Sequence, residues 1–286
     1  MQYSLKGKFI NYNGDNFKQE TFSLSYNNRA FKYGDGVFET IRTANKKPLF
    51  LNEHFTRLFY GMKLLKFDFD SDILKIELEK SILLLLNANK HFAASRIRIT
   101  IFRDGEGLYT PQTNKFNYLI ESQELETNEF TLNKKGYKID IFKDVKLRYS
   151  EFSSIKTLNS LPYILAGIYK NENKLDDCLL VNSLNTIVEA ISSNLFLVKD
   201  KTIITPGLNE GGINGITKNV IIDIALANKF SLIEDADVRE TDLLNADEVF
   251  LTNSISGITW VGAYKNKRYF NKTAKLLLKD LNALLH

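Results

Sequence analysis

A lysine among small and apolar residues is the first candidate for chemistry. Lys156 lies in the run Ile155–Pro162, just ahead of a segment with a helical pattern. A lysine that is partly shielded from water loses its proton more readily, and its amine can then form a Schiff base with an aldehyde. Taken by itself, however, the run is more typical of a surface lysine.

A glycine-rich run offers a candidate anion site. Gly211–Lys218 contains Gly211, Gly212 and Gly215 and lies between a predicted strand and a predicted helix. Glycines allow a close backbone approach, and a helix start presents unpaired N–H groups with a partial positive charge. Thr217 adds a hydroxyl group. The spacing matches neither a Walker A loop nor the dinucleotide fingerprint. A flexible connection before an ordinary helix is equally consistent with it.

Two further runs contain acidic residues in unusual surroundings. Glu189 lies in Val188–Phe196, among apolar and small residues. A carboxylate in such a strand needs a partner, and a pyridinium N–H group would supply one. In Tyr33–Thr40, two glycines bracket Asp35 before a short apolar run. This second run is also consistent with a plain turn into a strand.

The composition narrows the class of protein. The chain has 286 residues, of which 44% are hydrophobic and 25% charged, as in a folded protein of one large or two moderate domains. The single cysteine, Cys178, excludes an intrachain disulfide and fits a reducing compartment. No apolar run approaches the ~20 residues of a membrane helix, and the N-terminus lacks the apolar core of a secretion signal. We therefore expect a soluble, cytoplasmic protein.

Charge and histidine content argue against nucleic acid and metal as ligands. The formal net charge is only +4, and the charges alternate in sign along most of the chain, which suits a small anionic ligand better than DNA or RNA. His54, His91 and His286 are widely separated, and none has the spacing of a ligand pair. With a single cysteine, no structural zinc site is expected.

The pattern along the chain predicts two α/β domains. The expected organisation is a smaller domain over residues 1–120, a polar linker over 121–129 and a larger domain over 130–286 that carries Lys156. In the first domain we expect strands over 8–13, 21–25, 96–102 and 116–120, and helices that begin at the capping residues Asn52 and Ser71. In 96–102, strict alternation puts Ile97, Ile99 and Ile101 on the core face.

The second domain is predicted from alternating strand and helix patterns. Strands are expected over 137–142, 178–182, 186–190 and 248–252, with a hairpin formed by 194–198 and 202–205. Helices are expected over 160–169, 217–228 and 272–285. The first of these helices has an apolar stripe of Leu161, Ile164, Leu165 and Ile168. No internal repeat or low-complexity tract is present.

The four runs described first, taken in their order along the chain together with His54-Phe55-x-Arg57-Leu58, resemble the class IV aminotransferase family. Its members are pyridoxal 5'-phosphate (PLP) enzymes of fold type IV, including branched-chain and D-amino-acid aminotransferases and 4-amino-4-deoxychorismate lyase. The resemblance extends from about Gly7 to Gly262. It implies an α/β (α+β), two-domain fold like that of D-amino-acid aminotransferase, a homodimer, and a site near the domain junction closed partly by a partner's loop.

The resemblance also implies a role for each matching residue. Lys156 corresponds to the catalytic lysine that forms the Schiff base, and Glu189 to the carboxylate that pairs with the pyridine nitrogen. The other cofactor-binding positions are Arg57, Ser193, Asn194, Ile216, Thr217 and Ser254. The substrate-binding positions are Tyr33, Phe38, Arg42, Arg98, Arg103 and Asn253. No metal is implied.

Departures from the family patterns bear on the subfamily. Around Lys156 and Ser192-Ser193-Asn194 the sequence resembles the lyase or D-amino-acid types rather than the branched-chain type. The D-amino-acid type has a tyrosine where Phe31 stands and an Arg-x-His trap about where Leu108-Tyr109-Thr110 stands. The lyase type has an arginine before a Gly-Tyr pair that is absent here, whereas Asn253 fits it. Ala190 replaces the usual glycine and Lys218 the usual arginine.

Three hypotheses follow. The first is a 4-amino-4-deoxychorismate lyase that releases pyruvate and leaves 4-aminobenzoate for folate biosynthesis, acting on a small amino-carboxylate substrate. The second is a branched-chain or D-amino-acid aminotransferase, in which the same lysine moves a proton between Cα and C4′. The third is a non-catalytic anion-binding module, against which the set of Lys156, Glu189 and Arg57 argues.

Overall fold

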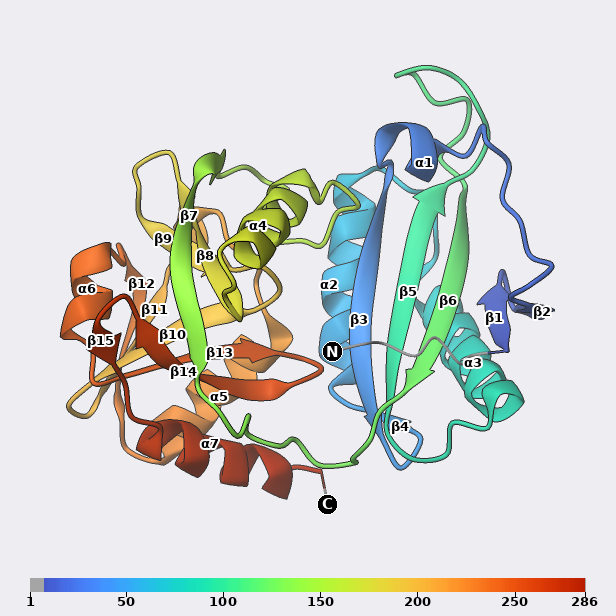
Figure 1. Ribbon diagram of the computed structural model, residues 1–286. Coiled ribbons are helices and arrows are strands. Elements are labelled where there is room, and N and C mark those ends of the chain that lie inside the picture. The colour runs from blue at the N-terminus through green and yellow to red at the C-terminus, as the bar shows by residue number, and fades with distance from the viewer. Residues whose placement is uncertain (1–7, 286) are drawn as a thin grey trace. The chain divides into compact units, whose positions relative to one another are not determined.

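The computed structural model describes residues 8–285 and divides the chain into two compact units (Figure 1). The first unit contains the chain up to Asn128 together with Ile155–Asn159. The second unit contains Glu129–Ser154 and the chain from Ser160 onward. The short segment Ile155–Asn159, which carries Lys156, is called the lysine segment below.

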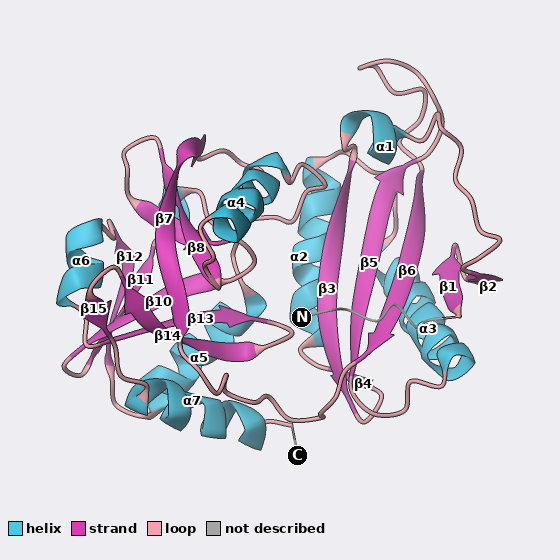
Figure 2. Cartoon of the chain, in the orientation of Figure 1, coloured by secondary structure: helices cyan, strands magenta, loops and turns pink. Residues whose placement is uncertain are grey.

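The first unit is a six-stranded sheet with two long helices on one face (Figure 2). The strand order is β2-β1-β6-β5-β3-β4, and all neighbouring strands are antiparallel. The strands are β1 (Phe9–Tyr12), β2 (Asp15–Lys18), β3 (Gly36–Ala44), β4 (Lys47–Pro48), β5 (Ser95–Arg103) and β6 (Phe116–Glu124). The helices are α1 (Arg29–Tyr33), α2 (Leu51–Leu64) and α3 (Ser71–Asn89).

Alternation along β5 gives this sheet a buried face and a polar face. Ile97, Ile99 and Ile101 are fully buried, as predicted, and they pack in one cluster with residues of α2 and α3. The arginines between them, Arg96 and Arg98, lie on the opposite face because successive side chains of a strand alternate.

The second unit is built on a mixed nine-stranded sheet of order β12-β11-β10-β13-β14-β7-β8-β9, with β15 paired to β14. An additional pairing between β9 and β10 joins Asn194 to Glu189. The strands are β7 (Tyr137–Leu147), β8 (Asp177–Asn182), β9 (Ile187–Ala190), β10 (Asn194–Lys199), β11 (Thr202–Pro206), β12 (Ser231–Ala236), β13 (Glu248–Asn253), β14 (Gly257–Tyr264) and β15 (Lys267–Arg268). The helices are α4 (Leu161–Glu172), the short 3-10 helix η1 (Leu208–Glu210), α5 (Ile216–Ala227), α6 (Glu240–Asn245) and α7 (Lys272–Ala283).

The N-terminal hairpin is tighter than the sequence predicts. Asn13 and Gly14 both have positive φ, 49° and 93°, which is the geometry of a two-residue hairpin turn. The second strand therefore begins at once, at Asp15, and the strand expected over 21–25 is absent from the described residues there.

Both predicted helix caps in this unit are wrong by one or two residues. The side chain of Asp70, not Ser71, accepts hydrogen bonds from the backbone N–H groups of Asp72 and Ile73 at the start of α3. The residue before α2 is Phe50, in the left-handed conformation, and Asn52 lies inside the first turn.

The predicted domain boundary also needs correction. The linker expected over 121–129 begins too early, because β6 continues to Glu124 and pairs there with Ser95. Lys156, which the sequence places in the C-terminal domain, groups with the first unit. The reason is backbone pairing with β3, described below.

The apolar stripe predicted on α4 does not face a core. Leu161, Ile164, Leu165 and Ile168 are between 42% and 71% exposed. The helix instead packs through Ala166, which is fully buried in a cluster that includes Phe142, Leu180 and Val188. A stripe of apolar residues at helical spacing identifies a face of the helix but not what covers that face.

Within residues 8–285, none of the helices combines the length and apolar character needed to cross a membrane. The same part of the chain contains no group of three or more His, Cys, Asp or Glu side chains that could hold a metal ion.

Candidate active site

The lysine segment adds to the sheet of the first unit at the start of β3. The Phe38 N–H group donates to the Lys156 carbonyl oxygen at 2.8 Å, and the Leu158 N–H group donates to the Gly36 carbonyl oxygen at 3.0 Å. Ile155, just before the lysine, is buried in the hydrophobic core of this unit. Lys156 therefore projects from backbone that is fixed on both sides.

Gly36 makes this close approach possible. A Cβ atom at Gly36 would lie 2.3 Å from the Ile101 carbonyl oxygen and 2.8 Å from Leu158 Cδ1, which is too close for any side chain. The run Tyr33–Thr40 is thus more than a turn into a strand. It is the surface on which the lysine segment docks.

The Lys156 amine and the Arg98 guanidinium group both lie against the aromatic ring of Phe38. Lys156 Nζ is 4.7 Å from the centroid of the Phe38 ring, and Arg98 Cζ is 3.8 Å from the same centroid. Burial lowers the pKa of Arg98, and the neighbouring charge of Arg96 lowers it further. The side chain of Arg98 donates a hydrogen bond from Nε to Thr100 Oγ1 at 3.3 Å. Three predicted residues are thus brought together, and Arg98 is suited to receive a carboxylate.

Arg57 is held by a carboxylate that the sequence analysis missed. Glu39 is fully buried and receives Arg57 Nε at 2.6 Å on one oxygen and Arg57 Nη2 at 2.8 Å on the other. His54 Nδ1 lies 2.8 Å from the second oxygen. This fork fixes the plane of the guanidinium group. The signal in the sequence was a glutamate on the apolar face of β3, between Val37 and Ile41.

The charge of Glu39 depends on these partners. Burial alone would raise the pKa of Glu39, but Arg57 and His54 outweigh it and lower the pKa from 4.5 to about 2. A carboxyl group with a lowered pKa stabilises the fold fully above its ordinary pKa, and that contribution is lost as the pH falls toward 2. The paired state of Arg57 is therefore complete at neutral pH.

In the second unit, the Glu189 carboxylate is buried and accepts hydrogen bonds from more than one element. Tyr163 Oη donates to Oε1 at 2.6 Å, and the Ile213 N–H group donates to Oε2 at 3.1 Å. Asn194 Nδ2 lies 3.4 Å from Oε2 and donates to the Ile213 carbonyl oxygen at 2.9 Å. The carboxylate is therefore oriented from two sides.

The start of α5 has the features of an anion site. Its N-cap is Gly215, which has no side chain to cap the helix, so the first backbone N–H groups have no acceptor within it. Thr217 is buried in the first turn, and its Oγ1 lies 3.4 Å from Ser254 Oγ. A Cβ atom at Gly215 would lie 1.8 Å from Asn194 Oδ1, so any other residue there would displace the Asn194 amide group. Asn253, which precedes Ser254, donates from Nδ2 to Ser193 Oγ at 2.9 Å.

Two of the predicted substrate-binding arginines donate to fixed protein acceptors. Arg42 Nη2 bonds to the backbone carbonyl of Thr127. Arg103 bonds to Asp35, Asn114 and the Leu65 carbonyl oxygen. Lys218 pairs with Glu234 at 3.1 Å. Of the three predicted arginines, Arg98 is the one that lies on the Phe38 ring beside Lys156.

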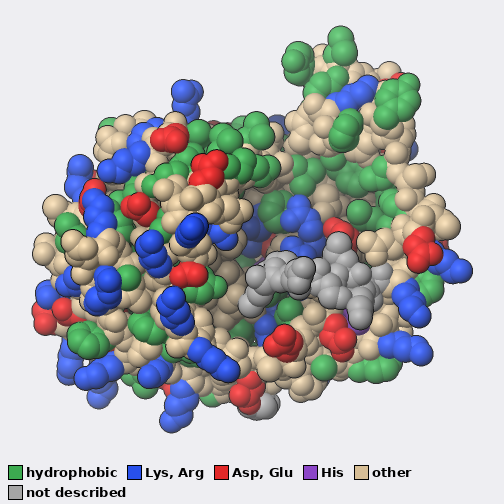
Figure 3. Space-filling view, viewed as in Figure 1, with side chains coloured by type: hydrophobic (Ala, Val, Ile, Leu, Met, Phe, Trp, Pro, Cys, Tyr) green, Lys and Arg blue, Asp and Glu red, His purple; other side chains and the backbone are tan. Residues whose placement is uncertain are grey.

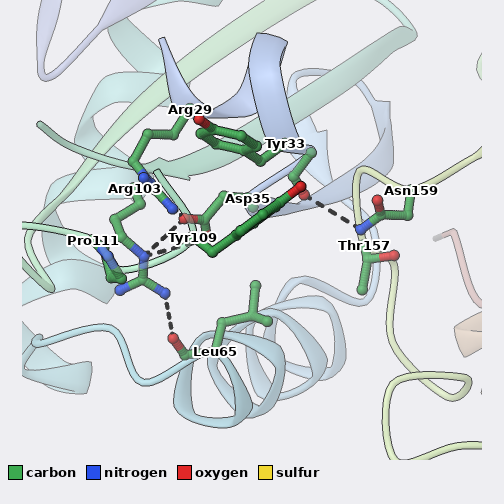
Figure 4. Close-up of a pocket in the computed structure, with 11 residues that line it drawn as sticks. Arg29, Tyr33, Asp35, Leu65, Arg103, Tyr109, Pro111, Thr157 and Asn159 are labelled. Atoms are coloured by element: carbon green, nitrogen blue, oxygen red, sulfur yellow. Dashed lines mark hydrogen bonds and ion pairs between the residues drawn. The ribbon is translucent and has the colours of Figure 1, made fainter. Parts of the chain in front are cut away.

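Tyr33 lies in a pocket of about 330 Å³ within the first unit (Figure 4). Arg29 and Arg103 share the carboxylate of Asp35 in its wall, at 2.8 and 3.0 Å. Thr157 and Asn159 of the lysine segment line the same pocket. The pocket thus connects the Tyr33 side of β3 with the residues that follow Lys156.

The first unit holds the Lys156 amine on fixed backbone, and the second unit holds the buried Glu189 carboxylate and an uncapped helix start that suits an anion. A protein-family profile described as amino-transferase class IV matches residues 36–264, and the chain belongs to this family. It is therefore a PLP-dependent enzyme, as the sequence analysis predicted.

Similar proteins include more than one activity. The chain is 29% identical over 250 residues to a D-alanine aminotransferase of Listeria monocytogenes, covering 85% of this chain and 82% of that protein. It is 26% identical over 260 residues to an aminodeoxychorismate lyase of Vibrio harveyi, covering 89% and 94%. A branched-chain amino acid aminotransferase structure from Escherichia coli superposes with a TM-score of 0.86 at 22% identity, covering 98% and 95%. The last comparison confirms the predicted fold type.

Proposed function

We propose that the protein is a 4-amino-4-deoxychorismate lyase, which releases pyruvate and 4-aminobenzoate for folate biosynthesis. The observation that carries the proposal is the Lys156 amine and the Arg98 guanidinium group on one Phe38 ring, a nucleophile beside a carboxylate receptor. The similarity to the Vibrio lyase along most of both chains supports it. The second candidate is an aminotransferase, which the similarity to the Listeria enzyme supports.

The residues fit PLP. The uncapped start of α5, with the Thr217 and Ser254 hydroxyl groups, suits a phosphate, and the buried Glu189 carboxylate suits a ring N–H group. When bound, PLP supplies an aldehyde and an electron-withdrawing ring. In our proposal, Ile216 and Thr217 bind the phosphate through the helix start, with Ser254 and Arg57. Ser193 and Asn194 are proposed to bind the cofactor at the end of the site where Glu189 lies.

In the proposed reaction, Lys156 moves the proton. Its amine takes a proton from the substrate carbon that bears the amino group, and this step precedes loss of pyruvate. Arg98 binds a substrate carboxylate and holds that carbon in place, and the Phe38 ring lies beside both the Arg98 guanidinium group and the Lys156 amine. Tyr33 and Asn253 complete the proposed substrate side. Arg42 and Arg103, which the sequence analysis assigned to substrate binding, are instead proposed to hold neighbouring protein groups in place.

We also propose a cytoplasmic homodimer. Apolar side chains gather on the projection formed by α1 and the loop after β5 (Figure 3). Phe31, Leu108 and Tyr109 are 82%, 76% and 90% exposed. The exposed stripe of α4 adds a second apolar surface. Such surfaces are typical of protein interfaces, and a second copy of the chain is the proposed partner.

Replacing Arg57 tests the phosphate contact. Arg57→Ala should weaken PLP binding about ten- to a hundredfold, because a charge-assisted hydrogen bond contributes roughly 1.5–3 kcal/mol. Arg57→Lys should recover only part of this loss, since a point charge cannot reproduce the fork. Ser254→Ala should cost less. The measurement is fluorescence titration of the cofactor-free protein with PLP. Unchanged affinity in Arg57→Ala would place the phosphate elsewhere.

A product assay separates the two candidate activities. The purified protein is incubated with aminodeoxychorismate in one arm, and with D-alanine or a branched-chain amino acid plus 2-oxoglutarate in the others. The lyase proposal expects pyruvate and 4-aminobenzoate in equal amounts from the first arm and no glutamate from the others. Glutamate formation, without 4-aminobenzoate from aminodeoxychorismate, would establish the aminotransferase instead. Lys156→Ala is the blank for every arm.

A further inference from the structure

Tyr163 is a residue of α4 that the predicted site does not include. Its ring packs against the buried cluster that contains Ala166 and Val188, and its hydroxyl group reaches Glu189 Oε1 at 2.6 Å. This is the shortest of the three hydrogen bonds given above for Glu189. The tyrosine lies two residues into a helix whose start contains Pro162, so its position is fixed by backbone as well as by packing.

The direction of this hydrogen bond is fixed by chemistry. Burial raises the pKa of Tyr163, and the charge of Glu189 and the hydrogen bond to it raise the pKa further. The phenol therefore stays protonated and donates the hydrogen bond, which the Glu189 carboxylate accepts. Donation to a carboxylate stabilises its charged form and makes it a weaker base. The other oxygen, Oε2, accepts a hydrogen bond from the Ile213 N–H group, and this bond restrains rotation of the carboxylate away from Tyr163.

We propose that Tyr163 is a positioning residue that orients Glu189 and sets the strength with which Glu189 holds the proton on the ring nitrogen of PLP. The inference rests on the proposed contact between Glu189 and that nitrogen. The phenol takes up part of the negative charge of Glu189. The ring nitrogen consequently loses its proton at a lower pH than it would opposite the same carboxylate without Tyr163.

The helix supplies a matched control. Tyr169 also packs against the same cluster, and its hydroxyl group also donates to a carboxylate, that of Asp140, at 3.2 Å. Tyr169→Phe thus removes a hydroxyl–carboxylate hydrogen bond from the same helix without touching Glu189. Any general effect of loosening α4 should appear in both variants.

The test is a pH titration of protein loaded with PLP labelled with ¹⁵N in the ring, followed by the nitrogen chemical shift. In Tyr163→Phe, the proton affinity of the ring nitrogen should increase about threefold or more, because a hydrogen bond to a charged group is stronger than a neutral one. Tyr169→Phe should titrate like the parent protein. Incorporation of 3-fluorotyrosine at position 163, a stronger donor, should shift the affinity the other way and keeps the test decisive if Tyr163→Phe folds poorly.

The possible failures are distinguishable. If Glu189→Gln leaves the ring titration unchanged, the proposed contact between Glu189 and the cofactor is wrong. If Glu189→Gln shifts the titration but neither change at position 163 does, the contact stands and the role of Tyr163 is overturned. The titration does not depend on which reaction the enzyme catalyses, so the product assay above is independent of it.

Discussion

Lys156→Ala is expected to abolish both turnover and the covalent retention of PLP. The amine is the proposed nucleophile and the proposed proton carrier, and general acid–base catalysis alone contributes about 10²–10⁴-fold. Turnover should therefore fall by about 10⁴-fold or more when both roles are lost. The parent protein should be yellow, and borohydride reduction should attach the cofactor permanently to Lys156, because it converts a reversible C=N bond into a stable secondary amine.

Peptide mapping after reduction measures this directly. A suitable control is Lys201→Ala, which changes an exposed lysine in the turn between β10 and β11. Its labelling and turnover should match those of the parent. Label on any lysine other than Lys156 would overturn the assignment.

The second large effect is expected at Glu189. Glu189→Gln keeps the size of the side chain and its acceptor oxygen but removes the charge that keeps a pyridine nitrogen protonated. Turnover should fall by roughly two orders of magnitude, or about 3 kcal/mol in activation free energy, while PLP remains bound. Steady-state kinetics with a parallel measurement of bound PLP separates the two effects.

Near-normal turnover in Glu189→Gln would mean that the carboxylate serves the fold alone. That alternative has a structural basis, because Tyr163, Ile213 and Asn194 all lie within hydrogen-bond distance of the carboxylate. A thermal melt distinguishes the cases. If the carboxylate is structural, its replacement should lower the melting temperature. If it faces the cofactor, its replacement should mainly lower turnover.

The elements that the sequence predicted well are those with strong local patterns. Alternation in β5 identified its buried isoleucines, and the Asn194–Thr205 hairpin appears as β10 and β11. These patterns depend on residues a few positions apart, so the sequence alone is enough to predict the strands. The family resemblance identified the residues around Phe38, which the structure groups with Lys156 and Arg98.

The features that were missed depend on contacts between distant parts of the chain. Glu39 holds Arg57 across 18 residues, and only the tertiary structure pairs them. The grouping of Lys156 with the first unit depends on backbone hydrogen bonds to β3, more than a hundred residues earlier. The exposure of the stripe on α4 could not be predicted either, because periodicity does not distinguish a buried face from an exposed one.

The late arrival of the lysine segment affects how the chain is made. A nascent chain that ends at Asn128 leaves the start of β3 as an open edge, without the backbone partners that Lys156 and Leu158 provide. Such edges recruit other strands, and the core position of Ile155 would also be empty. Fragments that stop before Asn159 should therefore self-associate on the ribosome or in vitro. A fragment supplied with a tethered copy of Ile155–Asn159 should remain monomeric, as size-exclusion chromatography of the two fragments would show.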